Sequence, residues 1–302
     1  MEKVLSGKPV AAALNKAAKR ILAEHPMEPK MLLIQVGSEA ASAYYVQSIL
    51  KNAAKFGCKA ELMSLPDDSG QDYLLKQIQR ANTDPYVHGI MIQKPLPKSF
   101  DESLINLSVN PDKDIDALNP INLGRIMAET EGFLPCTPAA VIYSLKYYGI
   151  DPVGKNTVIL GRSNVVGKPL ANILLWKKLN ATVTVCHSRT ANLADICRNA
   201  DILISAIGIP HFVKADMVKE NAVLIDVGIN EITGAEGKAI YVGDMDYKAL
   251  YDKALALTPV PGGIGRITTS LLYLNLIKAA LIAKGINKSV DEYIDLVFVE
   301  NT

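Results

Sequence analysis

The stretch from Ser42 to Asn52, SAYYVQSILKN, brings tyrosines and a lysine into one segment whose pattern predicts a helix. Residues four apart share a helix face, so Tyr45 and Ile49 point the same way, while Lys51 lies about 120° around the helix from Tyr45. Proton transfer to a ligand needs a titratable side chain within hydrogen-bond reach, and Ile49 is not one. Three interpretations are open: a site with a displaced lysine, a site that has lost its lysine, or a core helix.

A glycine-containing turn in the second half predicts a dinucleotide site. The strand-like run VILG leads into Gly161, Arg162 and Ser163, and Gly167 opens the next helical pattern. Glycine at a strand end lets the backbone approach a pyrophosphate, which N–H groups at a helix N-terminus stabilise. The spacing is not G-x-G-x-x-G, because Ser163 stands at the second glycine and Gly167 comes one residue late. An ordinary strand-to-helix turn is the alternative.

The end of the following strand, from Cys186 to Thr190, discriminates between the two nicotinamide cofactors. An NAD site places Asp or Glu there to hold the ribose hydroxyls. This segment has no carboxylate but contains Ser188 and Arg189. Together with Arg162 they suit a 2′-phosphate, so we predict NADP. Solvated surface arginines are the alternative.

Polar residues in the first half stand beside prolines. Gln93 closes a buried strand just before two prolines, which fix where it points. Asp114 and Asp116 flank an isoleucine in a loop, and no histidine or further acid cluster accompanies them. We therefore expect no metal site, and prefer a single Asp that reads the N–H donors of a heterocycle.

A second glycine-rich loop follows Pro259 near the end of the chain. Pro261 stiffens its start, and Gly262 and Gly263 carry no side chain. A ligand or another backbone segment can therefore come close to this loop.

Composition limits the class of partner. The chain has 302 residues, 49% of them hydrophobic, and 32 Lys and Arg nearly balance 31 Asp and Glu. With this balance of charge, the chain has no overall positive potential that would attract nucleic acid or an anionic membrane. No apolar run approaches the roughly 18 residues of a membrane span, and the cysteines form no C-x-x-C pair. We expect a small-molecule ligand and a reduced, cytoplasmic protein with no nucleic-acid or membrane partner.

Short β-rich runs alternate with helical patterns, which predicts an α/β fold with mainly parallel sheets. In the second half we predict five strands, in NTVILG, ATVTVC, ADILISAIG, AVLIDVGIN and YVGDM, the pattern of a doubly wound Rossmann-type domain. The expected domains are an N-terminal catalytic domain over 1–138 and a Rossmann domain over 139–269. An apolar helix begins the segment 270–302, which we expect to pack back on the first domain.

Taken together, these segments resemble one family, the methylenetetrahydrofolate dehydrogenase/methenyltetrahydrofolate cyclohydrolase family. The resemblance extends in order through VGSEAASAYYV, GIMIQKPLP, PDKDIDALNPINLGR, FLPCTP, GRSNVVGKP, VTVCHSRT, DVGIN, VGDMD and TPVPGGIG. It implies a folate-binding α/β domain, an NADP-binding Rossmann domain and a homodimer built through the Rossmann halves. It also implies oxidation of methylenetetrahydrofolate with NADP, followed by hydrolysis of the methenyl product to formyltetrahydrofolate.

By position, the resemblance implies that Tyr45, Gln93 and Asp116 act in the folate site. Pro261, Gly262 and Gly263 would line that site as well. The predicted cofactor-binding residues are Gly161, Arg162, Ser163, Gly167, Ser188, Arg189 and Ile229.

Three departures from the family pattern lie in folate segments, and none lies in a cofactor segment. The family's Tyr-Val-x-x-Lys ends here in Ile49, and its K-D-x-D-G ends in Ala117. Its P-G-G-V-G-P-M-T carries Arg266 and Ile267 instead of proline and methionine. In the family the lysine handles protons while water adds to the methenyl carbon. Hydride removal needs no such base, because the nitrogen lone pair drives it.

The leading hypothesis is therefore an NADP-dependent methylenetetrahydrofolate dehydrogenase whose cyclohydrolase step is weak or absent. The alternatives are a fully bifunctional enzyme and a non-catalytic relative that binds NADP or a pterin. A further one is a dehydrogenase for another small substrate, because Arg266 adds a cation that could attract an acidic group.

Overall fold

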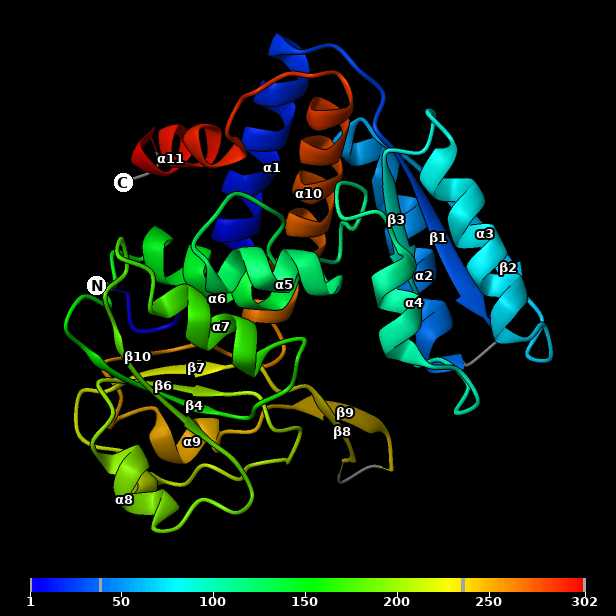
Figure 1. The fold of residues 1–302 in the computed structure, drawn as a ribbon. Coiled ribbons are helices and arrows are strands. Elements are labelled where there is room, and N and C mark those ends of the chain that lie inside the picture. The colour runs from blue at the N-terminus through cyan, green and yellow to red at the C-terminus, as the bar shows by residue number, and fades with distance from the viewer. Residues whose placement is uncertain (1, 38–39, 235–236, 301–302) are drawn as a thin grey trace. The chain divides into compact units, whose positions relative to one another are not determined.

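A computed structural model describes residues 2–37, 40–234 and 237–300, without the side chains of 40–45. The chain divides into two units, each with its own parallel sheet (Figure 1). The three-stranded unit comprises Ala13–Leu134 and Thr269–Thr302, and the five-stranded unit comprises Met1–Ala12 and Pro135–Thr268. The predicted α/β class with parallel sheets is confirmed.

The sheet of the three-stranded unit has the order β2-β1-β3, with β1 (Lys30–Val36), β2 (Lys59–Leu65) and β3 (Gly89–Ile92) all parallel. Strand β1 is central because its run KMLLIQV is buried at every position but the first. Such a continuous apolar run suits a strand covered on both faces.

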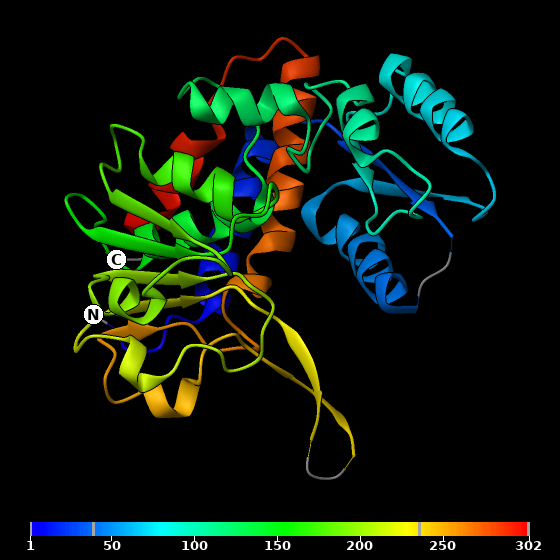
Figure 2. The same cartoon turned by 60° about the horizontal axis from the view of Figure 1, so that its bottom comes forward.

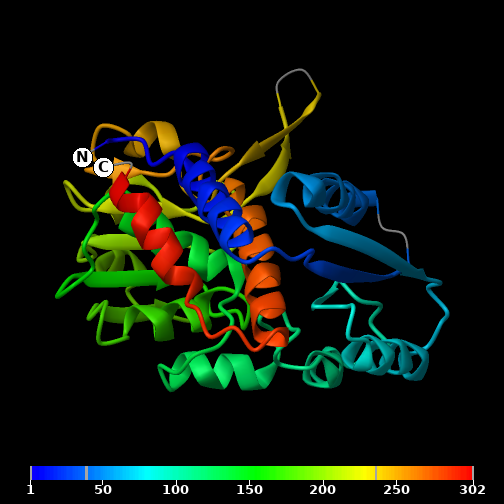
Figure 3. The ribbon, with the colours of Figure 1, turned by 90° about the horizontal axis from the view of Figure 1, so that it is seen from above.

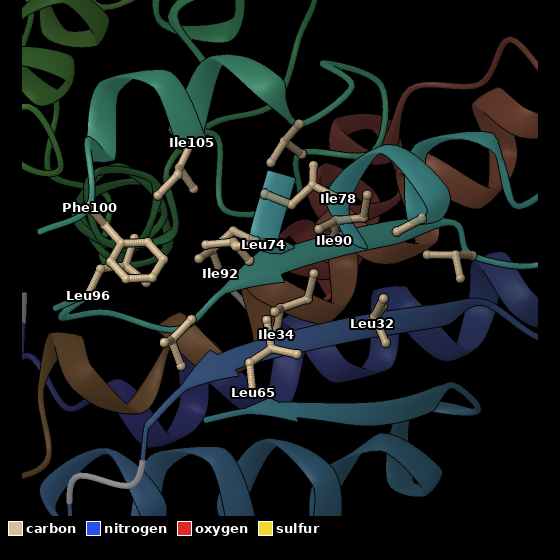
Figure 4. Close-up of a cluster of buried hydrophobic side chains, with 14 residues drawn as sticks. Leu32, Ile34, Leu65, Leu74, Ile78, Ile90, Ile92, Leu96, Phe100 and Ile105 are labelled. Atoms are coloured by element: carbon tan, nitrogen blue, oxygen red, sulfur yellow. The ribbon is translucent and has the colours of Figure 1, made fainter. Parts of the chain in front are cut away.

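One face of this sheet carries the core shown in Figure 4, where Ile34, Ile90 and Ile92 pack against Leu74 and Ile78 of α3. Helix α3 (Gln71–Thr83) and helix α4 (Glu102–Ser108) cover this face. The remaining helical elements of the unit are α1 (Gly7–Glu24), which begins in the other unit, α2 (Ala40–Asn52), η1 (Ala53–Phe56), α5 (Pro120–Met127), α10 (Thr268–Ala283) and α11 (Val290–Glu300).

The C-terminal helix α10 packs on the three-stranded unit, as the sequence predicted. Asn275 Nδ2 donates to the Ile115 carbonyl at 2.8 Å and to the Leu134 carbonyl at 3.0 Å. The following helix, α11, was not predicted. It lies beside α1 (Figure 3), where Glu300 pairs with Lys16 at 2.7 Å and with Arg20 at 2.8 Å.

The sheet of the five-stranded unit has the order β10-β7-β6-β4-β5, and all its neighbours are parallel. Its strands are β4 (Asn156–Leu160), β5 (Thr182–Cys186), β6 (Ile202–Ser205), β7 (Val223–Asp226) and β10 (Ala256–Leu257). Helices α6 (Cys136–Tyr147) and α7 (Gly167–Leu174) cover one face, and α8 (Leu193–Arg198) and α9 (Tyr247–Leu250) cover the other (Figures 1 and 2). Two short turns complete the unit, η2 (Ala215–Met217) and η3 (Ile264–Arg266). This is the predicted doubly wound fold.

The predicted strand in YVGDM is not part of this sheet. It falls in β9 (Ala239–Val242), which pairs antiparallel with β8 (Asn230–Thr233) in a separate hairpin that extends from the sheet (Figure 2). The fifth sheet strand is instead β10. The reason is burial, since Ile240 and Tyr241 are exposed, whereas both residues of β10 are buried.

The first twelve residues belong to the five-stranded unit and not, as expected, to the N-terminal domain. Residues 3–5 form an isolated bridge to β10, where Leu5 N donates to the Leu257 carbonyl at 2.9 Å and Leu257 N to the Lys3 carbonyl at 2.8 Å. The unit boundary after Leu134 lies four residues before the predicted one at 138. Among the described residues, no helix combines the length and apolar character that a membrane crossing requires.

Candidate functional site

The turn after β4 brings backbone very close to backbone. Gly161 has φ +112°, and a Cβ atom there would lie 2.4 Å from the Ala206 carbonyl oxygen. A Cβ on Gly167, the first residue of α7, would lie 2.1 Å from the Gly161 carbonyl oxygen. Contacts this short exclude any side chain, so the two glycines are required by geometry. They leave a cradle of backbone at the N-terminus of a helix, the environment that suits a phosphate.

The position of this cradle in the sheet also favours a nucleotide. Counted along the chain, the strand order is second, first, third, fourth, fifth, so the winding direction changes between β4 and β6. Ligands of open α/β sheets bind outside the carboxyl ends of the strands at such a switch point. Gly161 follows β4, and Ala206 follows β6.

Strand β5 brings its own carboxyl end to the same edge. Cys186 pairs with Leu160, and its carbonyl accepts from Gly161 N at 2.9 Å. The turn beyond is closed because His187 N donates to Thr190 Oγ1 at 2.9 Å. Ser188 and Arg189 stand exposed on this turn, and Arg162 is exposed on the neighbouring one.

Ser163 has a structural partner within the glycine turn. Its hydroxyl oxygen accepts from Val166 N at 3.0 Å, which holds the loop in shape ahead of α7. A glycine could not make this bond. The departure from G-x-G-x-x-G therefore supplies a side chain that fixes the turn.

Asp244 is a residue that the sequence reasoning missed. It is fully buried and accepts from Ser205 Oγ at 3.0 Å, Ile207 N at 2.8 Å, Ile209 N at 3.0 Å and Asn230 Nδ2 at 3.0 Å. This single carboxylate ties the loop after β6 to the start of the β8–β9 hairpin.

A second buried carboxylate, Asp226 at the end of β7, supports the first. It accepts from Gly228 N at 3.0 Å, Asp244 N at 3.0 Å and Met245 N at 2.8 Å. Burial raises the pKa of Asp226 to about 7, although these hydrogen bonds lower it. Ile229, a predicted cofactor-binding residue, comes directly after Gly228, and its side chain is 59% exposed. The sequence contained a signal for Asp226, because an Asp at the end of an apolar strand can accept hydrogen bonds from the N–H groups of the following loop.

The loop around Pro261 lies in the five-stranded unit. Gly262 has φ +115°, and its carbonyl accepts from Gly7 N at 2.8 Å. Gly263 is buried, and a Cβ there would lie 2.6 Å from the Pro259 carbonyl oxygen. Pro261 itself is exposed. Both glycines are thus needed for the backbone path, whatever the loop binds.

The residues that differ from the expected family pattern in the folate segments are not equally exposed. Arg266 is exposed at the end of η3, and Ile267 is fully buried. Ala117, in the three-stranded unit, is also fully buried and has φ +57°. A glycine would adopt that backbone conformation without strain.

In the three-stranded unit, Gln93 stands at the exit of β3 with an incomplete set of hydrogen bonds. Its backbone N–H donates to the Ile34 carbonyl at 2.8 Å, and its side-chain Nε2 donates to the Lys94 carbonyl at 2.6 Å. The buried Oε1 has no partner among the described residues. An unpaired buried acceptor is costly, so this oxygen is suited to a ligand's donor.

The two aspartates of the K-D-x-D segment differ sharply. Asp114 is buried and accepts from Leu118 N at 3.2 Å, Asn119 N at 2.8 Å and Asn122 Nδ2 at 2.9 Å, so it organises the following loop. Asp116 is half-buried, and no hydrogen bond within the described residues stabilises its carboxylate. Burial, together with the charge of Asp114, raises the pKa of Asp116 to about 6. Asp116 is the carboxylate left available for a ligand.

Helix α2 contains the stretch from Ser42 to Asn52 with its tyrosines and its lysine. The side chain of Tyr45 lies outside the described residues. Ile49 is fully buried, and its carbonyl accepts a hydrogen bond from the Tyr273 hydroxyl. Val46 and Ala53 are also buried, whereas Lys51 is exposed. Ile49 is therefore a buried position of α2.

No metal centre is evident in the part of the chain that is described. Within it, no three His, Cys, Asp or Glu side chains gather where they could hold a metal ion. Asp114, one of the two aspartates considered from the sequence, has its oxygens occupied by N–H groups of Leu118, Asn119 and Asn122.

Comparison with known proteins assigns the family. Residues 5–116 match the model described as Tetrahydrofolate dehydrogenase/cyclohydrolase, catalytic domain, and residues 135–284 match the NAD(P)-binding domain of the same family. The chain belongs to the tetrahydrofolate dehydrogenase/cyclohydrolase family. The residues predicted for folate and for the cofactor fall within these matched spans, with Tyr45, Gln93 and Asp116 in the first and the glycine cradle in the second.

Relatives in this family match over nearly their whole length. "Bifunctional protein FolD" of Campylobacter concisus is 42% identical over 281 residues, covering 92% of this chain and 97% of the relative. The protein of the same name from Dehalococcoides mccartyi is 44% identical over 292 residues, covering 94% and 99%.

Solved structures of the family have the same fold. The Campylobacter jejuni enzyme FolD-methylenetetrahydrofolate dehydrogenase/cyclohydrolase has a TM-score of 0.86 at 39% identity, covering 93% of this chain and 98% of that one. The Trypanosoma brucei methylenetetrahydrofolate dehydrogenase-cyclohydrolase, complexed with NADP and an inhibitor, has a TM-score of 0.85 at 32% identity, covering 94% and 98%.

Proposed function

We propose that this protein oxidises methylenetetrahydrofolate to methenyltetrahydrofolate with NADP, and that its cyclohydrolase step is weak or absent. The family supplies the reaction class. The cradle of Gly161 and Gly167 at the switch point fits a dinucleotide, and the exposed Ser188, Arg189 and Arg162 beside it suit a 2′-phosphate. When bound, NADP accepts the hydride.

The chain's own residues hold the folate. Gln93 Oε1 is a buried acceptor without a partner among the described residues, and Asp116 is a carboxylate without hydrogen bonds there. Both can accept hydrogen bonds from N–H groups of the pterin ring and so fix the orientation of the ring. Positioning of this kind suffices for hydride transfer, because the nitrogen lone pair of the substrate expels the hydride and no base takes a proton.

The cyclohydrolase step has a further requirement. Water must lose a proton as it adds to the methenyl carbon, so a titratable group must lie within hydrogen-bond reach. The observation that carries the proposal is Ile49, which is 0% exposed and has no titratable atom at the position of the family's lysine. Lys51 is exposed on another part of the helix surface.

The fully bifunctional alternative draws its support from the relatives, which carry the name bifunctional at 42% and 44% identity. The non-catalytic alternative predicts that NADP or a pterin binds without turnover. Measurement of both half-reactions separates all three. NADPH formation without hydrolysis supports the proposal, both activities support the bifunctional alternative, and neither activity supports the binding protein.

We also propose that the protein is cytoplasmic and forms a homodimer through the five-stranded units. The β8–β9 hairpin supports the dimer, because Ile240 and Tyr241 are 45% and 51% exposed there. Ile240→Glu should shift sedimentation from dimer to monomer, whereas Leu255→Glu, at another exposed site of the unit, should not. A monomeric wild-type protein would contradict the proposal.

A further inference from the structure

Lys94 follows one of the predicted pterin-binding residues, Gln93, and leaves β3 at the edge where the segment of the other, Asp116, begins. Strand β3 runs parallel to the segment before Asp116, because Ile90 bridges to Asp114 and Ile90 N donates to the Lys113 carbonyl at 2.7 Å. Two parallel segments leave a sheet at the same edge. The residues beyond β3 and those beyond Asp114 therefore leave together.

The ammonium of Lys94 is held on this edge by an acidic partner. Its Nζ lies 3.0 Å from Glu102 Oε2 of α4, and the Lys94 side chain is only 25% exposed. The neighbouring cation Lys113 is directed elsewhere, because its Nζ donates to the carbonyls of Ala81 and Asp84 at 3.0 and 2.6 Å. The nearby segment of α10 is neutral, with Asn275 bonded to the Ile115 carbonyl.

The Asp116 carboxylate has fewer stabilising partners than the Asp114 carboxylate. Three N–H donors stabilise the Asp114 carboxylate, whereas Asp116 has no such donors among the described residues. Burial and the charge of Asp114 favour the protonated form of Asp116, and the charge of Lys94 opposes them. These are the charged groups of the described residues that act on Asp116. A protonated carboxyl group loses acceptor capacity for the N–H groups of a pterin.

We propose that Lys94 is a positioning residue of the pterin site, whose ammonium keeps the Asp116 carboxylate ionised and so able to accept hydrogen bonds from the substrate. This inference rests on the proposed function. Lys94 pairs with Glu102 at the exit of β3, and we assign it the orientation of Asp116 and not the proton transfer of the lysine missing at position 49. In this assignment the cation of the pterin site lies at the exit of β3 and serves orientation instead of proton transfer.

The first test is a direct titration of Asp116 in the protein without ligands, followed by ¹³C NMR of labelled aspartate carboxyl groups. An opposite charge a few ångströms away lowers a carboxyl pKa by about 1 unit or more. Lys94→Met should therefore move the Asp116 midpoint upward by about 1 pH unit. Lys98→Met, at an exposed lysine four residues along, should leave it in place. An unchanged midpoint in Lys94→Met would overturn the inference.

The second test is the pH profile of the KM for methylenetetrahydrofolate. In the wild type, the KM should rise as the pH falls through about 6, because Asp116 becomes protonated there. In Lys94→Met this rise should begin about 1 pH unit higher. At pH 7 the KM of Lys94→Met should be raised several-fold, and at pH 8.5 it should return toward the wild-type value. A purely structural role would raise the KM equally at every pH, which would contradict the inference.

Failure of the proposed function looks different. Wild-type protein that does not turn over methylenetetrahydrofolate at any pH would overturn the function. The NMR titration would still decide whether Lys94 holds Asp116 in its ionised form.

Discussion

The carboxylates of the five-stranded unit and the acceptors at the predicted pterin site of the three-stranded unit differ in their hydrogen bonds. In the five-stranded unit, Asp226 and Asp244 are surrounded by backbone N–H donors of neighbouring loops. In the three-stranded unit, Asp116 and the Gln93 Oε1 atom lack such donors among the described residues. A saturated carboxylate is a structural element, whereas an unsaturated buried acceptor is available to a ligand. The five-stranded unit thus shapes its predicted cofactor site with backbone groups, whereas the three-stranded unit shapes its predicted pterin site with side chains.

The largest effect should come from removal of the unsaturated carboxylate. Two charge-assisted hydrogen bonds contribute about 3 to 6 kcal/mol, so Asp116→Ala should reduce kcat/KM for methylenetetrahydrofolate by about 10²- to 10⁴-fold. NADP should still bind, because the cradle lies in the other unit. The measurement is initial-rate NADPH formation together with fluorescence titration of NADPH. Folate turnover that survives nearly intact would show that Asp116 only caps its loop.

A saturated carboxylate should behave differently. Asp244→Asn replaces one acceptor oxygen with an N–H₂ group that faces backbone donors, so we expect a loss of about 2 to 4 kcal/mol in the free energy of unfolding. Urea denaturation measures this loss, and weaker NADP binding should accompany it. Asp252→Asn, at an exposed site of the same unit, is the matched control. Equal stability of the two variants would refute the role assigned to Asp244.

The comparison also explains what could be predicted from the sequence. The helix α2, the strand β4 and the glycine turn were predictable because helical spacing, apolar runs and glycine each reflect a local constraint. The site residues Gln93 and Asp116 rested on family resemblance. Asp244 was missed because its five donors come from two segments distant from it in the sequence, residues 205–209 and Asn230, which only the fold brings together.

The errors have a similar physical origin. The YVGDM strand was assigned to the main sheet because a strand pattern does not specify its partner, and exposure of Ile240 and Tyr241 was needed to place it in a hairpin. The grouping of the N-terminal residues with the five-stranded unit was not foreseen, because the pairing of Leu5 with Leu257 spans almost the whole chain. Long-range pairing of this kind leaves no local signature.

A smaller effect should come from replacing the protein side chains that we predict to bind the 2′-phosphate beside the backbone cradle. Each charge-assisted bond to a 2′-phosphate contributes about 1.5 to 3 kcal/mol, so Arg162→Ala should raise the KM for NADP by about 10- to 150-fold. The KM for NAD should change little, because NAD lacks that phosphate. Ser188→Ala should act in the same direction more weakly, as a neutral hydroxyl. Equal catalytic efficiency of the wild type with NADP and NAD would contradict this assignment.

The central claim is that the two half-reactions separate at Ile49, and one set of assays tests it most directly. NADPH formation and methenyltetrahydrofolate hydrolysis are measured side by side on the wild type, Ile49→Lys, Ile49→Met and Lys51→Ala. Ile49→Met is the matched control, because a volume-conserving apolar change there costs less than about 1.5 kcal/mol and adds no titratable group. Thermal unfolding and NADPH binding verify that each variant is folded.

We expect the wild type to form NADPH with little hydrolysis, Ile49→Lys to gain hydrolysis, and Ile49→Met and Lys51→Ala to match the wild type. Rapid hydrolysis by the wild type that disappears in Lys51→Ala would contradict the account, because Lys51 would then perform the proton transfer that Ile49 cannot.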